Sequence, residues 1–309
     1  MTSSDQKTLG LTPDQLTQFQ RDGYLLIPNF LSEEEIQALR ARTDTMLNKD
    51  FDPSTHPGTQ FTTGDDKGED HIGDQYFLTS GSKVRFFLEP DAIDPISHNL
   101  VRPPSLSINK IGHGLHMLDP TFASVTINEK TRAIAEGMRY NDPRVLQSMV
   151  ILKQPEIGGA VPSHMDSTFL YTDPPSAVGF WIALEDCTKT NGCLSFVPGS
   201  HRWAAVTKRF VRQGEGTGFE DVEPVTPNRP VIPEMEKVKP GGEFVMGESK
   251  AGTLVLIHGS ILHKSERNTS QDSRWIYTFH VIEGENVYDK KNWLQPEEGQ
   301  EFTKLYDHE

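Results

Sequence analysis

The second half of the chain consists of short apolar segments separated by turn residues. These segments are rich in Val, Ile, Leu and aromatic residues and lie at 145–153, 161–171, 178–185, 194–197, 253–258, 263–266 and 274–282. Strands of this length at close spacing are typical of antiparallel sandwiches and barrels. Asn191-Gly192, the strongest hairpin signal in the sequence, lies between two of the segments. We therefore expect a mainly β fold, with helices from the preceding region packed on one sheet.

The first 143 residues carry helix signals. Leu11-Thr12-Pro13 is a typical helix start, Ser32-Glu-Glu-Glu35 has the spacing of a capping box, and a longer helical block is expected over 109–138. Strand-like runs at 23–28 and 83–88 interrupt this pattern. A chain of 309 residues can bury a substantial core. We expect one domain over 1–309, with a helix-rich part (1–143) and a β-rich core (144–285).

Residues 212–252 form a long stretch that is dense in Gly, Pro and Glu. A structureless segment of that length is uncommon inside a domain, and it is usually functional or disordered. Two interpretations stay open. The segment is either a lid over the mouth of a site or a surface insertion with no role in the chemistry.

Composition and charge exclude several classes of partner. The formal charge of −14 argues against binding to nucleic acid or to anionic membranes. No apolar run approaches the roughly 18–20 residues of a spanning helix, and the N-terminus lacks the apolar stretch of a secretory signal. We therefore expect a cytoplasmic protein with a small-molecule substrate; the oligomeric state is left open. Cys187 and Cys193 are expected to be buried, reduced thiols.

His164-Met165-Asp166 is the first candidate for chemistry. Alternate side chains of an extended strand point to one face, so His164 and Asp166 would point together while Met165 points away. By itself the pair is weak evidence, because the chain contains 11 histidines and many aspartates. With a distant second histidine it completes the set of two imidazoles and one carboxylate that holds Fe(II). That set leaves coordination positions open for oxygen chemistry.

His263 is the favoured second histidine, since it ends an apolar strand-like run. Arg274 begins the next such run, and a turn over 268–272 would bring the two residues close together. An arginine at this place suits the far carboxylate of a five-carbon keto diacid whose other end chelates the iron. An ordinary surface ion pair remains the alternative for Arg274. His258 and His280 remain alternative metal ligands, although each lies in an apolar run that a core histidine could occupy.

A series of specific sequence strings runs along the chain. They are Gln18–Tyr24, Lys83–Phe87, Ser107–His116, Gln147–Met149, Gly179–Asp186, Asn191–Leu194, Pro198–His201, His258-Gly259, His263–Ser265 and Asn292–Pro296. In content and order these strings resemble the phytanoyl-CoA dioxygenase family over nearly the whole chain.

The resemblance implies a double-stranded β-helix (a cupin-like jelly roll) flanked by helices, and an Fe(II)- and 2-oxoglutarate-dependent dioxygenase. In such an oxidoreductase O₂ and 2-oxoglutarate are consumed, a ferryl intermediate hydroxylates a small organic molecule, and succinate and CO₂ are released. The resemblance further implies that iron is bound by His164, Asp166 and His263. It also implies that the 2-oxoglutarate pocket is lined by Lys110, Met149, Trp181, Ser265 and Arg274. Because Asp166 stands where halogenating relatives carry a small residue, hydroxylation is favoured over chlorination.

Residue chemistry alone leaves other roles and functions open. Lys110 could be a solvated lysine at a helix start, and Met149 and Trp181 could be ordinary core residues. The alternatives to an oxygenase are a non-catalytic jelly roll that senses iron or 2-oxoglutarate and a zinc hydrolase with the same three ligands. The complete ligand set argues against the sensor, and Arg274 argues against the hydrolase. The primary substrate, an acyl-CoA or another metabolite, stays open.

Overall fold

The largest sheet takes strands from both halves of the chain. The computed structural model describes residues 9–60, 73–94, 96–97, 99–225 and 242–306. Within them the sheet is antiparallel and has the order β1 (Tyr24–Ile27), β11 (Leu254–His258), β6 (Val178–Ala183), β13 (Arg274–Glu283), β4 (Pro143–Lys153), β3 (Ile108–His113) and β2 (Val84–Leu88), with β14 (Thr303–Lys304) paired to β4. The N-terminal third therefore contributes strands to this sheet as well as helices.

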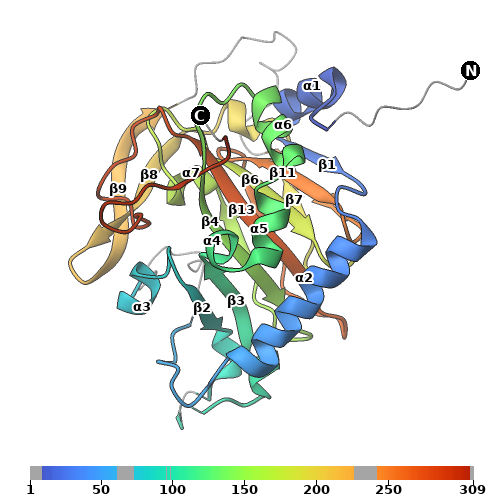
Figure 1. The fold of residues 1–309 in the computed structure, drawn as a ribbon, viewed down its shortest axis with the longest axis vertical. Helices are drawn as coiled ribbons and strands as arrows, with labels where there is room; N and C mark the ends of the chain where they lie inside the picture. Colours follow the sequence, from blue (N-terminus) through green and yellow to red (C-terminus); the bar gives the residue numbers. More distant parts are fainter. Residues whose placement is uncertain (1–8, 61–72, 95, 98, 226–241, 307–309) are drawn as a thin grey trace, which may run out of the picture.

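A smaller antiparallel sheet supplies the second layer. Its order is β10 (Val245–Gly247), β7 (Leu194–Phe196), β12 (His263–Ser265) and β5 (Val161–His164). A separate hairpin pairs β8 (Val206–Gln213) with β9 (Gly216–Val225) and lies to one side of the two sheets (Figure 1). The predicted mainly β fold with flanking helices is confirmed.

The helices lie mostly on one face of the large sheet (Figure 1). The described helices are α1 (Pro13–Asp22), α2 (Glu33–Thr45), α3 (Gln75–Leu78), α4 (Leu115–Leu118), α5 (Pro120–Thr126), α6 (Glu129–Gly137) and α7 (Asp166–Phe169). The capping box predicted at Ser32 is present: its hydroxyl accepts from the Glu35 N–H, and the Glu35 carboxylate accepts from the Ser32 N–H. None of these helices is long and apolar enough to cross a membrane.

Alternation along β13 separates the core from the side of the sheet that faces the smaller sheet. Tyr277, Phe279 and Val281 are buried in the same apolar cluster as Leu39 of α2 and Phe122 of α5. The intervening side chains point the other way, as the two-residue period of a strand requires. These intervening residues are Arg274, Ile276, Thr278 and His280. One face of β13 therefore packs in the apolar core, and the opposite face carries Arg274, Thr278 and His280 toward the smaller sheet.

The core face of β13 provides a stability prediction. The ring of Phe279 is fully buried and stacks on Phe180 with a centroid distance of 4.7 Å. Phe279→Ala should lower the free energy of unfolding by about 3–5 kcal/mol, because apolar contacts are lost and a cavity remains. Phe244→Ala, at a partly exposed phenylalanine, should change it by less than about 0.5 kcal/mol. Urea unfolding, monitored by circular dichroism, measures the free energy of unfolding of both variants. Equal losses in the two variants would contradict the packing of Phe279 in the core.

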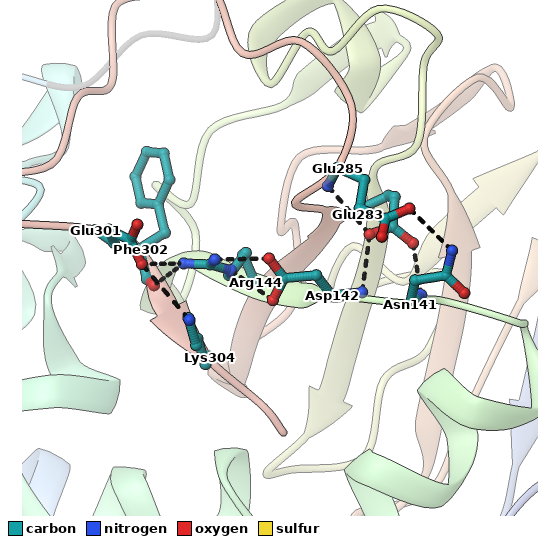
Figure 2. A network of polar contacts seen from close by, with 8 residues as sticks. All are labelled: Asn141, Asp142, Arg144, Glu283, Glu285, Glu301, Phe302 and Lys304. Atoms are coloured by element: carbon teal, nitrogen blue, oxygen red, sulfur yellow. Dashed lines mark hydrogen bonds and ion pairs between the residues drawn. The ribbon is translucent and has the colours of Figure 1, made fainter. Parts of the chain in front are cut away.

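A network of polar contacts ties the C-terminal segment to the start of β4. Figure 2 shows Arg144 between the carboxylates of Asp142 and Glu301, at 2.6 and 2.8 Å. The Glu283 carboxylate at the end of β13 accepts hydrogen bonds from the backbone N–H groups of Asn141 and Asp142, at 2.7 and 2.9 Å. These bonds hold together the start of β4, the end of β13 and the short strand β14.

Several local predictions differ from the structure. Residues 108–113 form strand β3 and not the start of the expected helical block, because they pair with both β2 and β4. The strand expected over 161–171 ends at His164, and Asp166 begins the single helical turn α7. Asn191-Gly192 does form a turn, but β6 and β7 on its two sides belong to different sheets and are not a hairpin. Cys187 and Cys193 are free and buried, as predicted.

The 212–252 segment is structured in the parts that the structure describes. Its first residues complete β8 and form β9, and Val245–Gly247 forms β10. The expectation of one long structureless loop is therefore wrong for these parts, while residues 226–241 lie outside the described residues. The role of the segment as a lid stays a prediction.

Candidate active site

Three predicted metal ligands come together where the smaller sheet meets α7. His164 ends β5, His263 begins β12, and the two residues are direct partners in the strand register. The Oδ1 atom of Asp166 lies 3.5 Å from Nε2 of His164 and 3.6 Å from Nε2 of His263. One ligand atom from each residue lies within 4.8 Å of the others. Although the strand ends before Asp166, the helical turn still directs the carboxylate to the two imidazoles.

The hydrogen bonds of His164 and His263 determine which ring nitrogen keeps a lone pair for a metal ion. Nδ1 of His164 lies 2.9 Å from the Pro162 carbonyl, and Nδ1 of His263 lies 3.1 Å from the Ile261 carbonyl. A carbonyl can only accept, so each Nδ1 carries the hydrogen and each Nε2 keeps a lone pair. This is the arrangement that orients metal-binding histidines and increases their basicity.

The charge state of the cluster also suits a divalent cation. Burial alone would raise the pKa of Asp166, but charge interactions with His263 and His280 and the hydrogen bond from His280 hold that pKa well below its ordinary value. Burial and the neighbouring His164 lower the pKa of His263 to about 4. At neutral pH the Asp166 carboxylate is therefore anionic and the His263 imidazole is neutral, and two imidazoles with one carboxylate are the donor set that fits Fe(II).

All the predicted site residues line one cavity of about 340 Å³. The three residues of the cluster share its wall with Lys110, Met149, Trp181, Ser265 and Arg274. His263 and Arg274 belong to different sheets, so they meet across the space between the sheets and not as neighbouring strands. The turn that was predicted to bring them together instead connects the two layers.

Arg274 is the cavity residue that most clearly lacks a partner. Its side chain is only 2% exposed, its guanidinium carbon lies 5.7 Å above the Trp181 ring, and its Nε has no hydrogen-bond partner among the described residues. Burial lowers the pKa of Arg274, but an arginine keeps its charge in proteins. A buried guanidinium without an anion is costly. The position therefore favours a carboxylate ligand over the surface ion pair considered above.

Lys110 is a second buried cation in the cavity. It is 5% exposed and lies in the middle of β3, paired with Phe87 of β2 and Ile151 of β4. The alternative of a solvated lysine at a helix start is thus wrong. Burial lowers the pKa of Lys110 to about 7, and the nearby Glu89 carboxylate limits this decrease.

Several cavity residues were not predicted from the sequence. They are Glu89, His113, Gln147, Lys153 and His280, with His280 considered only as a metal ligand. Gln147, Met149, Ile151 and Lys153 alternate along β4, so the period of a strand extended from Met149 would have found Gln147 and Lys153. The Lys153 ammonium donates to the carbonyls of Gly159, Ser265 and Glu266, and burial lowers its pKa.

The two alternative ligand histidines have different positions. The ring of His258 lies 4.8 Å from that of His201 and 6.1 Å from that of Phe19, and it does not line the cavity. His280 lies beside the cluster, with Nε2 at 3.3 Å from Oδ2 of Asp166, the carboxylate oxygen that does not face the other two histidines. His280 therefore orients the carboxylate, and His263 completes the cluster.

The fold is the jelly roll of iron- and 2-oxoglutarate-dependent oxygenases, as predicted. The non-haem α-ketoglutarate-dependent carbocyclase SnoK superposes with a TM-score of 0.59 at 20% identity, covering 92% of this chain and 89% of SnoK. EctD from S. alaskensis with 2-oxoglutarate and 5-hydroxyectoine gives 0.58 at 18% identity, covering 94% of this chain and 82% of EctD. At these sequence identities the structural similarity to SnoK and EctD establishes the fold alone.

The chain belongs to the phytanoyl-CoA dioxygenase family, whose sequence model matches residues 19–276. Phytanoyl-CoA dioxygenase domain-containing protein 1 from Bos taurus is 44% identical over 303 residues, which is 96% of this chain and 99% of the relative. Phytanoyl-CoA dioxygenase from Arabidopsis thaliana is 43% identical over 289 residues, which is 93% and 95% of the two chains. The family predicted from the sequence strings is confirmed.

Proposed function

We propose that this protein is an Fe(II)- and 2-oxoglutarate-dependent dioxygenase that hydroxylates a small organic molecule and releases succinate and CO₂. The observation that carries the proposal is one cavity that holds a largely buried cluster of two histidines and an aspartate together with buried Arg274, whose Nε has no hydrogen-bond partner in the described part of the chain. The family and the structural neighbours support the same class of reaction.

The residues of the cavity would have separate roles in binding the metal and the cosubstrate. Fe(II) held by His164, Asp166 and His263 would supply the activation of O₂, coupled to oxidative decarboxylation of 2-oxoglutarate. Arg274 would bind the far carboxylate of 2-oxoglutarate through its planar fork of N–H donors. His263 and Arg274 are buried between the two sheets, and burial strengthens these charge interactions.

Four further residues would complete the 2-oxoglutarate pocket. Lys110 would supply a second positive charge, and the Ser265 hydroxyl, which donates to the Gly192 carbonyl at 2.8 Å, would turn to donate to a carboxylate oxygen of the bound cosubstrate. Met149 and Trp181 would pack against the carbon chain of the cosubstrate. Trp181 also lies beneath the Arg274 guanidinium and helps to hold it in place.

Succinate formation tests the proposal. The purified full-length protein is incubated with Fe(II), 2-oxoglutarate and air, with omission of each component in turn, and succinate is measured by mass spectrometry. Succinate should form only when all three components are present. A protein that binds both Fe(II) and 2-oxoglutarate but forms no succinate with any member of a metabolite library would contradict the proposal and favour a sensor.

The pKa of Lys110 predicts a pH dependence of 2-oxoglutarate binding. Its pKa of about 7 in the free protein should rise when the dianion binds, so the charged form is the binding form. Affinity is then full below pH 7 and is lost as the pH rises. Between pH 6.5 and 8.5 the dissociation constant should increase about 10- to 25-fold, with uptake of a proton. Calorimetry in two buffers of different ionisation enthalpy measures this uptake.

Lys110→Met is the matched variant for this measurement. It keeps the length and the apolar part of the side chain but cannot take up a proton. The variant should bind 2-oxoglutarate more weakly than the unaltered protein at pH 6.5, and its dissociation constant should be almost independent of pH. If the variant retained the pH dependence of the unaltered protein, Lys110 would not be the titrating group.

A further inference from the structure

The cavity has two ends of different chemical character along β4 and β13. The strand register pairs Lys153 with Arg274 at one end and Gln147 with His280 at the other. Lys153 follows Gln147 by six positions along the strand, which corresponds to roughly 20 Å. The cations proposed to bind 2-oxoglutarate lie toward the Arg274 end. The Gln147 end is therefore left for the second reactant.

Aromatic side chains form the wall at the Gln147 end. Phe77 stacks on Trp293 with a centroid distance of 4.3 Å, and Phe169 and Phe210 lie 5.5 Å apart. The Phe169 ring is 5.8 Å from that of His164, so this wall begins next to the metal cluster. All four rings line the cavity.

A chain of hydrogen bonds leaves one acceptor of Gln147 without a partner. Nε2 of His280 lies 3.3 Å from Oδ2 of the Asp166 carboxylate, and Nδ1 of the same ring points to Gln147. The Gln147 amide nitrogen lies 3.5 Å from that Nδ1, which turns the amide oxygen away from it. The side chain of Gln147 is only 6% exposed, and its Oε1 has no hydrogen-bond partner among the described residues.

A second free acceptor belongs to His113, which contacts the aromatic wall. The Ser80 hydroxyl donates to the Phe77 carbonyl at 2.6 Å, so it accepts from Nδ1 of His113 at 2.7 Å. Nε2 of His113 then carries a lone pair, and no hydrogen bond to it is found among the described residues. Burial lowers the pKa of His113 to about 3, so the ring is neutral at physiological pH.

Charged lining residues are concentrated away from this end. Glu89, Lys110 and Lys153 lie toward Arg274, and Asp166 belongs to the metal cluster. The remaining charged lining residue, Lys264, forms an ion pair with Glu266 at 2.6 Å. The aromatic end of the cavity, in its described part, thus offers two uncharged acceptors, and the one lining cation whose charge reaches His113, Lys110, is assigned to 2-oxoglutarate.

We propose that the part of the substrate that enters this cavity is uncharged and mainly apolar or aromatic. It carries hydroxyl or N–H donors, which bind Oε1 of Gln147 and Nε2 of His113. A carboxylate or phosphate would lose its hydration next to two acceptors and gain no positive charge, which is strongly unfavourable. This inference rests on the proposed function, because it assigns the Arg274 end to 2-oxoglutarate.

Four probes of nearly equal size test the proposed chemistry. They are benzamide (neutral, with donors), acetophenone (neutral, without donors), benzoate (anion) and benzamidinium (cation). Each is titrated by ligand-observed NMR into the full-length protein, saturated with 2-oxoglutarate and with Mn(II) in place of iron so that nothing turns over. Benzamide should bind about 3- to 10-fold more tightly than acetophenone, the range expected for one neutral hydrogen bond, and benzoate should bind most weakly.

Two variants and one control assign the effect to the named acceptors. Gln147→Leu and His113→Phe should each reduce the preference for benzamide over acetophenone. His116→Phe makes the same change at a buried histidine outside the cavity and should leave the preference unaltered. Binding of benzoate or benzamidinium as tight as that of benzamide, no binding of benzamide, or a full preference in both variants would overturn the inference. Mn(II) and 2-oxoglutarate affinities, measured on the same samples, show separately whether the proposed function fails.

Discussion

Asp166→Ala should abolish succinate formation and weaken Fe(II) binding by more than about 100-fold. Loss of a residue that only orients a metal ligand already costs about 10- to 100-fold in affinity, and Asp166 would be a ligand itself. It is also the only anionic member of the cluster. Isothermal titration with Fe(II) under anaerobic conditions, together with the succinate assay, measures the two effects.

The same change should leave the fold intact. The Asp166 carboxylate contacts the imidazoles of His164, His263 and His280, which line the cavity, so its loss removes no packing from the apolar core. Asp91→Ala, at an exposed aspartate on the surface, is the control and should keep full activity. Retention of Fe(II)-dependent turnover by the folded Asp166→Ala protein would show that the metal is held elsewhere.

Arg274→Ala should raise the concentration of 2-oxoglutarate required for half-maximal turnover by roughly 30- to 4,000-fold. Removing one partner of a buried, charge-assisted pair costs about 2–5 kcal/mol. Turnover at saturating 2-oxoglutarate should fall much less, because Arg274 is not part of the metal cluster. Initial rates over a range of 2-oxoglutarate concentrations separate the two quantities.

One further variant shows whether 2-oxoglutarate binding needs the two-pronged guanidinium of Arg274 or only its charge, and a second variant is the control. Arg274→Lys keeps the charge but loses the planar pair of donors, so its requirement should lie between those of the unaltered protein and the alanine variant. Arg267→Ala removes an exposed arginine that pairs with Asp91 and should change nothing. An unchanged 2-oxoglutarate requirement in Arg274→Ala would contradict the assignment of Arg274 as the anchor.

The residues of the site that follow from strand alternation, or from sequence strings shared with the family, could be predicted from the sequence. His164, Asp166 and His263 were identified by residue type and by resemblance to the family, and the structure brings them together. Lys110, Met149, Trp181, Ser265 and Arg274 all line the predicted cavity.

The errors arise where tertiary pairing overrides local pattern. Residues 108–113 contain a lysine and a glycine and have little strand propensity of their own, but neighbours on both sides complete their hydrogen bonds. Asn191-Gly192 specifies a turn but not which strands it joins. The partnerless atoms of Gln147 and His113 follow from neighbours distant in the sequence, namely His280 and Ser80. No local pattern contains that information.

Anomalous diffraction at the iron absorption edge tests the central claim most directly. Crystals grown without oxygen in the presence of Fe(II) and 2-oxoglutarate should show one strong peak within coordination distance of three atoms. These atoms are Nε2 of His164, Oδ1 of Asp166 and Nε2 of His263, and electron density for 2-oxoglutarate should extend from the peak to Arg274. A peak at any other place, or one beyond bonding distance of His263, would contradict the account.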